Sequence, residues 1–379
     1  MKKRMFAAML ALAMALSLLA GCTEPADPTD PSGDPEPTGP VETVIDMKND
    51  VGVTINWQQK ITPEVAKLLK DSGVTYVRIV FSYPFGADGI TPNAGYMTAK
   101  RCAQVCHDAG LKIMAQSIWP GGMAYNAATG QVQWTSNLPE VYEDYDDEYF
   151  YKMVKAAYKY VAKDIKDICS TWLVSNEPDI STYTGPMTVD QIVRYIESSA
   201  EGIKEGNPAA SCGVNMLVEV WEEYSLKIVR QLYDEDSVLD WMGLDGYYGT
   251  LQEGGPETWE YYINTFYEAA GVPIVITEYG YSSAEYDPKN TCKYQWEGHG
   301  ARGPEVQGEY IKACLELFAK HPEVLGSFWY ALSDDDPTGV CWECGDPECN
   351  LYSSWGLLNH DNTPKPALGG LSEGAKAYH

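Results

Sequence analysis

The sequence predicts an α/β fold, a (β/α)8 TIM barrel that forms one domain over residues 43–379. Short apolar and β-branched runs alternate eight times with longer segments of helical periodicity, and such alternation indicates a parallel sheet. The length of this region suits a barrel with insertions. No glycine-rich phosphate loop follows the first strand, which disfavours the alternative, an open doubly wound sheet.

Each strand is expected where apolar and β-branched residues run together between turn residues. The strands are predicted at 51–56, 75–81, 111–116, 171–175, 211–217, 241–247, 273–278 and 324–331. The helices are recognised by apolar residues at helical spacing and by their ends. In the first helix Thr62 supplies the N-cap, Pro63 takes the first position, and Gly73 follows the end. The helices are predicted at 62–71, 97–109, 146–166, 189–204, 222–233, 257–270 and 305–320, with a short terminal helix from about Pro366.

Three of the predicted connections are long, at 118–145, 281–303 and 332–355. All three follow strands, so they belong to the face of the barrel where active sites are found. Long loops inside a compact domain usually have a functional reason. We therefore expect the functional site on this face.

The first 42 residues predict export and anchoring. A basic start and a short apolar run are typical of an export signal, and the Leu-Ala-Gly-Cys at 19–22 resembles a bacterial lipobox. In such signals cleavage precedes the cysteine, whose thiol is lipidated; an ordinary signal peptide is the alternative. The next segment is rich in Pro, Asp, Glu and Thr and has little apolar surface to bury. We expect a lipoprotein signal peptide at 1–22, a disordered linker at 23–42, and an extracellular protein anchored to the cell-surface membrane through Cys22.

The formal net charge of −27 limits the possible partners. Binding of nucleic acid needs a basic surface, so the charge argues against it. It also disfavours an anionic polysaccharide. The 27 tyrosines and 11 tryptophans far outnumber the 7 phenylalanines, and rings with a polar edge suit wet surfaces on which sugars stack. Most of these rings are nevertheless expected in the core.

Two glutamates stand where strands four and seven of such a barrel would end. Glu177 lies in Ser-Asn-Glu-Pro at 175–178, and Glu278 lies in Ile-Thr-Glu-Tyr-Gly at 276–280. These strands face each other across an eight-stranded barrel, so both carboxyl groups are expected in one pocket. Close carboxyl groups push their pKa values apart, which leaves one protonated and the other ionised. Such a pair is the minimum needed to cleave a glycosidic bond.

The two motifs together resemble glycoside hydrolase clan A, the retaining barrel hydrolases, over the whole of 43–379. The resemblance implies that Glu177 is the acid/base, that Glu278 is the nucleophile, and that no cofactor or metal takes part. Asn176 matches the residue that binds the sugar 2-hydroxyl, and Arg78 matches the arginine beneath the nucleophile. Tyr247 matches the tyrosine that hydrogen-bonds the nucleophile, and Trp329 matches the tryptophan that forms the floor of the sugar site. Tyr248 is the alternative to Tyr247, and a place in the core is the alternative for Trp329.

The resemblance within the clan is family 5-like, with two departures from that family. That family usually carries a histidine near the end of strand three and another just before the strand-six tyrosine, whereas this chain has Gln116-Ser117 and Asp245. We expect retaining, endo-acting hydrolysis of a β-linked and neutral polysaccharide or oligosaccharide, so the expected partner is carbohydrate. The alternatives are a surface glycan-binding lipoprotein on an inactive barrel and a transglycosylase that uses the same residues.

The cysteines fall into two groups. Cys341, Cys344 and Cys349 lie in the loop after strand eight, and Cys292 and His299 lie in the loop after strand seven. Their spacing permits either a structural zinc site or disulfides, and both would cross-link these loops. The second group is expected to be buried as small apolar residues, and it consists of Cys102, Cys106, Cys169, Cys212 and Cys314.

Overall fold

The computed structural model describes residues 43, 45–86, 89–117, 121–126, 131–136, 144–218, 222–284, 302–336 and 349–378. The chain divides into two units, Met1–Glu42 and Thr43–His379, and the described residues belong to the second. The signal peptide, the linker and the anchor at Cys22 lie outside them and stay predictions. Within the described part of the chain, no helix has the length and apolar character needed to cross a membrane.

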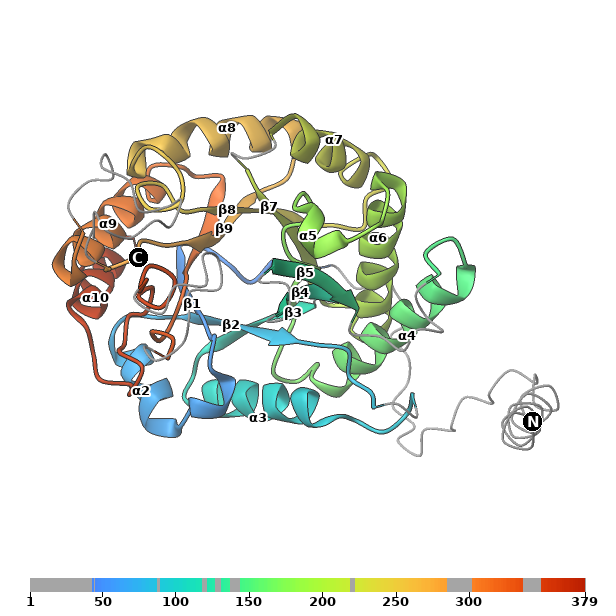
Figure 1. Cartoon of the computed structure of the whole chain (residues 1–379), viewed down its shortest axis with the longest axis horizontal. Coiled ribbons are helices and arrows are strands. Elements are labelled where there is room, and N and C mark those ends of the chain that lie inside the picture. The colour runs from blue at the N-terminus through green and yellow to red at the C-terminus, as the bar shows by residue number, and fades with distance from the viewer. Residues whose placement is uncertain are drawn as a thin grey trace. The chain divides into compact units, whose positions relative to one another are not determined.

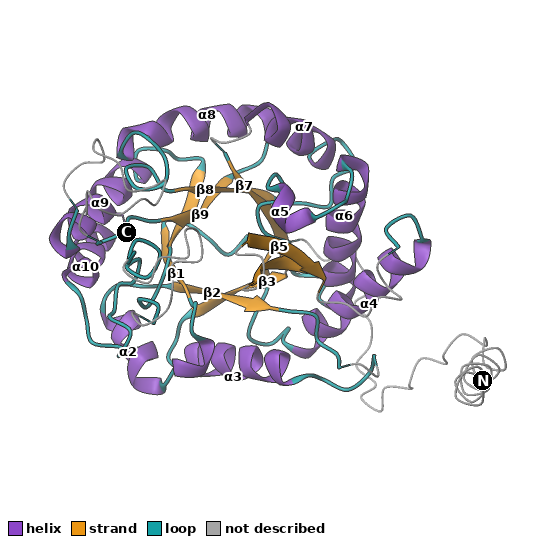
Figure 2. Ribbon diagram, in the orientation of Figure 1, coloured by secondary structure: helices purple, strands orange, loops and turns teal. Residues whose placement is uncertain are grey.

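Parallel strands close into a barrel at the centre of a ring of helices, as Figures 1 and 2 show. The strand order is β1-β10-β9-β8-β7-β6-β3-β2, and β1 pairs with β10 to complete the circle. The predicted (β/α)8 barrel is thereby confirmed, and the open sheet is wrong. The strands are β1 (Asp50–Thr54), β2 (Tyr76–Phe81), β3 (Lys112–Ser117), β6 (Thr171–Leu173), β7 (Ser211–Leu217), β8 (Trp241–Gly246), β9 (Ile274–Tyr279) and β10 (Val324–Trp329).

Local sequence explains where several helices begin. The Thr62 side chain accepts a hydrogen bond from the backbone N–H of Val65, and Pro63 occupies the first turn. Thr188 and Gln191 form a reciprocal capping box at the start of a later helix. The main helices are α2 (Pro63–Asp71), α3 (Ala94–Asp108), α4 (Glu148–Asp164), α6 (Val189–Gly206), α7 (Glu222–Leu232), α8 (Trp259–Ala270), α9 (Pro304–Phe318) and α10 (Pro366–Tyr378).

Two small features were not predicted. The first long connection contains an antiparallel hairpin of β4 (Gly121–Asn126) and β5 (Gln131–Ser136). A short helix, α5 (Ser181–Thr184), follows β6. Both lie in connections that leave the carboxyl ends of barrel strands, which is the face predicted to carry the site.

The barrel interior is apolar in the half nearer the amino ends of the strands. Two of its rings fit because the neighbouring strands carry glycine at the paired positions. A Cβ at Gly52 would overlap the ring of Phe328, and a Cβ at Gly213 would overlap the ring of Trp241. This inner apolar cluster consists of Met47, Tyr76, Met114, Leu173, Trp241, Val275 and Phe328.

Further along the same strands the interior becomes polar. Side chains two positions apart on a strand point to the same side, so the residue two places after an inward apolar residue also faces inward. Arg78 follows Tyr76 in this way, and Gln116 follows Met114. The buried polar layer that results includes Arg78, Gln116, Asn215, Asp245 and Thr277.

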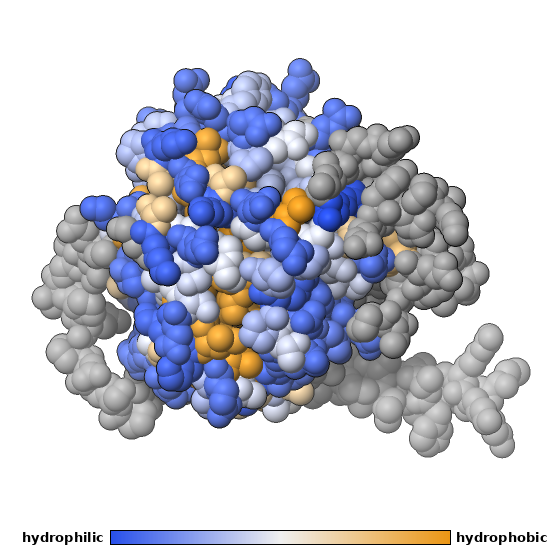
Figure 3. Space-filling model, turned by 90° about the vertical axis from the view of Figure 1, so that its left-hand side faces the viewer, coloured by the Kyte–Doolittle hydropathy of each residue, from blue (hydrophilic) through white to orange (hydrophobic). Residues whose placement is uncertain are grey.

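The outer surface on the side of α9 and α10 is mostly hydrophilic, with hydrophobic residues in small patches (Figure 3). Most of the large hydrophobic side chains that are exposed are tyrosines, whose hydroxyl groups can stay in water. The exposed ones are Ile90, Met97, Tyr149, Tyr160, Tyr261 and Tyr267. The helices thus bury one face against the barrel and keep the other in solvent.

Two neighbouring glycines of α10 test the helix packing. A Cβ at Gly370 would overlap the backbone of Gly308 in α9, whereas nothing lies within 4 Å of a Cβ at Gly369. We predict that Gly370→Ala lowers the free energy of unfolding by about 1–3 kcal/mol through overpacking. Gly369→Ala should raise it by up to about 1 kcal/mol, because alanine favours a helix over glycine. Urea unfolding followed by circular dichroism measures both, and equal effects would contradict the close approach of α9 and α10.

Candidate active site

Glu177 follows β6 in a strained piece of backbone. Ser175 and Glu177 both have positive φ, 74° and 41°, which L-residues with side chains rarely adopt. Two side chains from neighbouring strands hold this conformation. Ser117 Oγ accepts from the backbone N–H of Ser175 at 2.8 Å, and Asn215 Oδ1 accepts from that of Glu177 at 2.9 Å. Strain of this kind costs on the order of 1–3 kcal/mol per residue and occurs mostly at functional sites.

Glu278, across the barrel in β9, is held by two partners. Arg78 forms an ion pair with Oε1, and the hydroxyl of Tyr247 donates to Oε2. Both partners therefore lie where the sequence predicted. Tyr248 does not reach the site, because its ring is buried against Trp259 outside the barrel.

A β-bulge in β9 turns Glu278 toward the interior. Leu244 of β8 pairs with Ile276, but the next residue, Asp245, pairs with Glu278, so Thr277 is the extra residue. Strict alternation would send Thr277 and Glu278 to opposite faces, whereas both contact interior residues. The bulge is thus what brings the carboxyl group of Glu278 into the site.

Three buried carboxyl groups converge there. One oxygen each of Glu177, Asp245 and Glu278 lie within 4.8 Å of one another. Asp245 was not among the predicted site residues. The sequence marked it only as the departure from histidine before the strand-six tyrosine, and that was the signal that could have found it.

The three carboxyl groups have different electrostatic surroundings. Burial, and next the charges of Asp245 and Glu278, raise the pKa of Glu177 well above its usual value. Burial and the charge of Glu278 likewise raise the pKa of Asp245. Burial alone raises the pKa of the nearby Asp179 to about 7. Arg78, by contrast, places its cation directly against Glu278.

A carboxylate triad of this size could in principle ligate a metal ion. Here, however, protein donors already occupy both oxygens of two members. Arg78 and Tyr247 take those of Glu278, while Asn215 and Thr277 take those of Asp245. The arrangement therefore suits proton transfer and nucleophilic attack better than binding of a cation.

Asn176 extends from the same strained turn toward Glu177. Its amide nitrogen donates to Glu177 Oε2 at 3.2 Å, and its Oδ1 accepts from Gln116 Nε2 at 2.9 Å. Asn176 is half-buried, whereas Gln116 is buried. The amino group of Asn176 is thus directed at the carboxyl group beside it.

Trp329 lies elsewhere than the sequence predicted. Phe328 points into the barrel, so alternation along β10 sends Trp329 outward, where its ring packs on Tyr279 with centroids 5.2 Å apart. Its Nε1 donates to the backbone oxygen of Trp355. The next residue, Tyr330, is the aromatic ring near the carboxyl groups, 6.0 Å from the ring of Tyr247. Trp329 therefore lies in the core, which was the alternative to a place in the sugar site.

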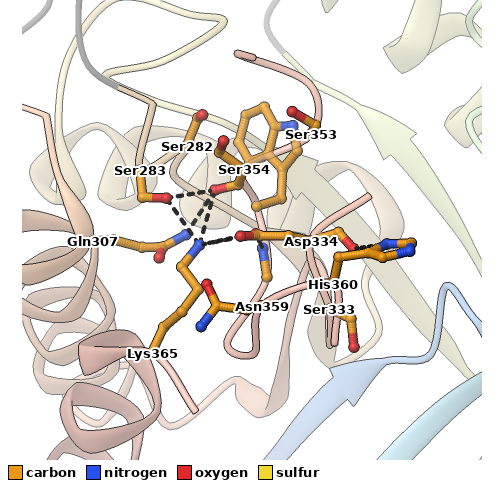
Figure 4. Close-up of polar contacts among 12 residues, drawn as sticks. Ser282, Ser283, Gln307, Ser333, Asp334, Ser353, Ser354, Asn359, His360 and Lys365 are labelled. Carbon is orange, nitrogen blue, oxygen red and sulfur yellow. Dashed lines mark hydrogen bonds and ion pairs between the residues drawn. The ribbon is translucent and has the colours of Figure 1, made fainter. Parts of the chain in front are cut away.

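A second buried ion pair ties together the loops on this face (Figure 4). Lys365, just before α10, contacts both oxygens of Asp334 at 2.9 and 3.0 Å and donates to Ser283 Oγ at 2.9 Å. Asp334 also accepts from the backbone N–H of Gly356 at 2.7 Å. The segments after β9 and β10 and the stretch before α10 are thereby joined, which fixes one wall beside the carboxyl groups.

The predicted cysteine cross-link is only partly described. Cys349 is buried and packs in a small cluster with Leu351. Cys341, Cys344, Cys292 and His299 lie outside the described residues, so the zinc and disulfide alternatives stay predictions. The prediction of burial is confirmed for the second group, which is Cys102, Cys106, Cys169, Cys212 and Cys314.

Comparison with known proteins finds structural similarity without a sequence family. No protein-family model and no curated protein matches the sequence. A subfamily 18 member of glycoside hydrolase family 5 from Streptomyces cattleya, in complex with GlcNAc, gives a TM-score of 0.65 at 15% identity over 88% of this chain and 80% of that one. The β-glycosidase BGL167 gives 0.62 at 13% over 83% and 85%. A family 39 glycoside hydrolase from Bacteroides cellulosilyticus WH2 gives 0.59 at 18% over 87% and 64%. Such similarity establishes the barrel fold.

The ion pair of Lys365 should matter for stability. Lys365→Met leaves the carboxylate of Asp334 buried without its cation. We predict a loss of about 3 kcal/mol in the free energy of unfolding, at the lower end for a broken buried pair, because 17% of the Asp334 side chain stays exposed. Thermal or urea unfolding measures the loss. Adding Asp334→Asn should recover part of it, and a double variant no more stable than Lys365→Met would contradict this interpretation.

Glu177 should ionise at unusually high pH for a glutamate. In carbon-13 NMR of protein labelled at the glutamate carboxyl carbons, the resonance missing from Glu177→Gln identifies it. We predict that the chemical shift of this resonance reports a protonated carboxyl group above the usual pKa of 4.5. The shift should change as the pH rises through the raised pKa. Asp245→Asn should lower its midpoint, because a neighbouring negative charge is lost. Glu64, whose pKa the Thr62 hydroxyl lowers, should titrate below 4.5 in both proteins; a midpoint for Glu177 as low as this would refute the assignment.

Proposed function

We propose that this protein is a retaining glycoside hydrolase that cleaves β-linked, neutral carbohydrate through a covalent glycosyl-enzyme intermediate. The observation that carries the proposal is the pair Glu177 and Glu278, with oxygens within 4.8 Å and unequal surroundings. Retaining enzymes separate their two carboxyl groups by roughly 5–5.5 Å, and inverting enzymes by about 6.5–9.5 Å. The short separation supports retention.

In the first step, Glu278 attacks the anomeric carbon and the glycosidic C–O bond breaks. Glu177 gives its proton to the departing oxygen, so its raised pKa serves the reaction. Because Asn176 donates to Glu177 Oε2, that oxygen acts as an acceptor, and the proton to be transferred sits on Oε1. The product of this step is an ester between the sugar and Glu278.

In the second step, water attacks the same carbon and Glu177, now ionised, removes its proton. The ester bond to Glu278 breaks and the carboxylate returns to Arg78 and Tyr247. These partners offer a cation and a hydrogen-bond donor to the carboxylate of Glu278, which suits both a nucleophile and a leaving group. Tyr330, half-buried beside Tyr247, takes the role of sugar platform that was expected of Trp329.

The comparisons support the carbohydrate part of the proposal. Similar barrels include the S. cattleya enzyme, also solved as a single-residue variant in complex with Manβ1-4GlcNAc, and an exo-β-1,4-mannosidase from an Opitutaceae bacterium. The formal charge of −27 supports a neutral sugar. The long connections on the catalytic face support several sugar subsites and hence endo action. The lipobox-like 19–22 supports an extracellular enzyme tethered through Cys22.

Two other functions would use the same barrel. A glycan-binding protein on an inactive barrel is disfavoured, because binding alone requires neither the strained turn at Glu177 nor a nucleophile held by two partners. A transglycosylase differs only in the acceptor of the second step. Product analysis with and without acceptor sugars separates it from a hydrolase, after a panel of β-glucans, mannans, xylans and galactans has identified the substrate.

Substitution of the two glutamates should impair activity in different ways. Glu278→Ala removes the attacking group, so activity should collapse by roughly 10⁴-fold or more on every substrate. Glu177→Ala should lose a comparable factor on polysaccharide but far less on an aryl glycoside with an activated leaving group, which needs no proton in the first step. Steady-state kinetics on both substrates measures the difference.

The stereochemistry provides an independent check. Proton NMR should find that the first product keeps the anomeric configuration of the substrate. Inversion would overturn the role of Glu278 as nucleophile. Equal losses for the two variants on both substrates would overturn the division of roles while leaving the site itself in place.

A further inference from the structure

A chain of hydrogen bonds connects Asn176 with Asp245. Asn215 Nδ2 donates to Asp245 Oδ2 and, at 3.2 Å, to Asn176 Oδ1. Gln116 Nε2 makes the second bond to that oxygen, at 2.9 Å. Asn215 and Asp245 have no exposed surface, and Gln116 is 3% exposed. We refer to Asp245, Asn215, Gln116 and Asn176 as the amide relay.

The orientation of the side-chain amides in the relay follows from one backbone N–H group. A side-chain amide can be turned by 180°, so its orientation has to be argued from its partners. The backbone N–H of Glu177 can only donate, so the atom of Asn215 that faces it, 2.9 Å away, is the oxygen. The amide nitrogen of Asn215 then faces Asp245 and Asn176. The Asn176 atom opposite it is consequently the oxygen, and the amino group of Asn176 is left to face Glu177.

The reverse orientation of Asn176 is disfavoured. It would set the amino group of Asn176 against the amide nitrogen of Asn215, so that two donors met without an acceptor between them. It would also bring Asn176 Oδ1 against Glu177 Oε2. Buried donors left unpaired are costly, so the relay selects one of the two orientations.

Asp245 supplies the acceptor that ends the relay in either protonation state. Thr277 Oγ1 contacts Asp245 Oδ1 and lies 3.3 Å from the backbone oxygen of Leu244. The hydroxyl can donate to an ionised Asp245, or accept from a protonated one while it donates to Leu244. In both cases Asp245 Oδ2 stays an acceptor for Asn215, and the relay keeps its direction as the pH changes.

We propose that Asp245 and Asn215 are positioning residues that hold the amide of Asn176 with its amino group toward the 2-hydroxyl of the sugar being cleaved. The proposal rests on the glycosidase function proposed above. Contacts to this hydroxyl strengthen in the transition state, so their loss should appear mainly in kcat rather than in KM.

The test compares an aryl glycoside that the wild type cleaves with its 2-deoxy analogue. Asp245→Leu removes the acceptor at the end of the relay. We expect the ratio of kcat/KM on the aryl glycoside to kcat/KM on its 2-deoxy analogue to fall about tenfold, which is the effect of one hydrogen bond. The ratio should approach that of the Asn176→Ala variant. Any effect of the substitution on Glu177 should change the rates on both substrates alike and so cancel in this ratio. An unchanged ratio would overturn the proposal.

Two further variants separate positioning from general damage. Asp245→Asn keeps an oxygen for Asn215 and can turn its amino group toward Thr277, so it should keep the ratio. Asp179→Asn is the matched control, because Asp179 is also a buried carboxyl near Glu177 but bonds the backbone N–H of Leu217 and the hydroxyl of Ser225, outside the relay. It should alter both rates by the same factor. A fall in the ratio for Asp179→Asn equal to that for Asp245→Leu would also overturn the proposal.

A measurement without substrate distinguishes failure of the relay from failure of the proposed function. Melting temperatures of the wild type, Asp245→Leu, Asn176→Ala and the double variant form a cycle. If the relay exists, the melting temperature of the double variant should fall by less than the sum of the decreases in the two single variants. Additive losses would overturn the relay even in an active enzyme. If the wild type cleaves no glycoside, the proposed function fails and this cycle still decides the relay. Should Asp245→Leu not fold, Asn215→Asp, which presents an acceptor to Asn176, replaces it in both tests.

Discussion

The buried ion pair between Arg78 and Glu278 determines the chemistry of the other groups in the site. The two side chains are only 2% and 7% exposed. Around them lie three further buried carboxyl groups, those of Glu177, Asp179 and Asp245. One guanidinium cannot neutralise four carboxylates. Burial raises the pKa values of Glu177, Asp179 and Asp245, and the charge of Glu278 adds to this for Glu177 and Asp245. The ion pair thereby distinguishes Glu278, which has a cation beside it, from the carboxyl groups that have none.

Such a cluster can be buried because the barrel is built in layers. The apolar layer near the amino ends of the strands fills the interior and contributes stability. The polar layer above it satisfies its own hydrogen bonds across strands, so the cost of burying polar groups is largely offset. The strained turn at Ser175 and Glu177 belongs to this second layer, since Ser117 and Asn215 hold it there. Stability and function are thus separated along the axis of the barrel.

The wall beside the carboxyl groups is held by charge as well. Lys365 and Asp334 join segments that are far apart in the sequence (Figure 4). Gln307 of α9 adds hydrogen bonds to the backbone oxygens of Tyr281 and Ser354. These contacts fix the position of Trp355, whose ring lies 5.2 Å from that of Tyr247. The stretch that precedes α10 therefore supports the catalytic face, whereas α10 itself packs against α9.

The sequence by itself determined the barrel and the two glutamates. Alternating strand and helix patterns are local signals, and motifs at strand ends keep their place in any closed barrel. It also identified Arg78, Asn176 and Tyr247. It did not identify the bulge at Thr277, the outward direction of Trp329 or the part played by Asp245 and Asn215. Each of these depends on register between strands distant in sequence, and a shift of one residue exchanges the inner and outer faces. Only the closed barrel sets that register, so only the tertiary structure could decide which polar side chains meet.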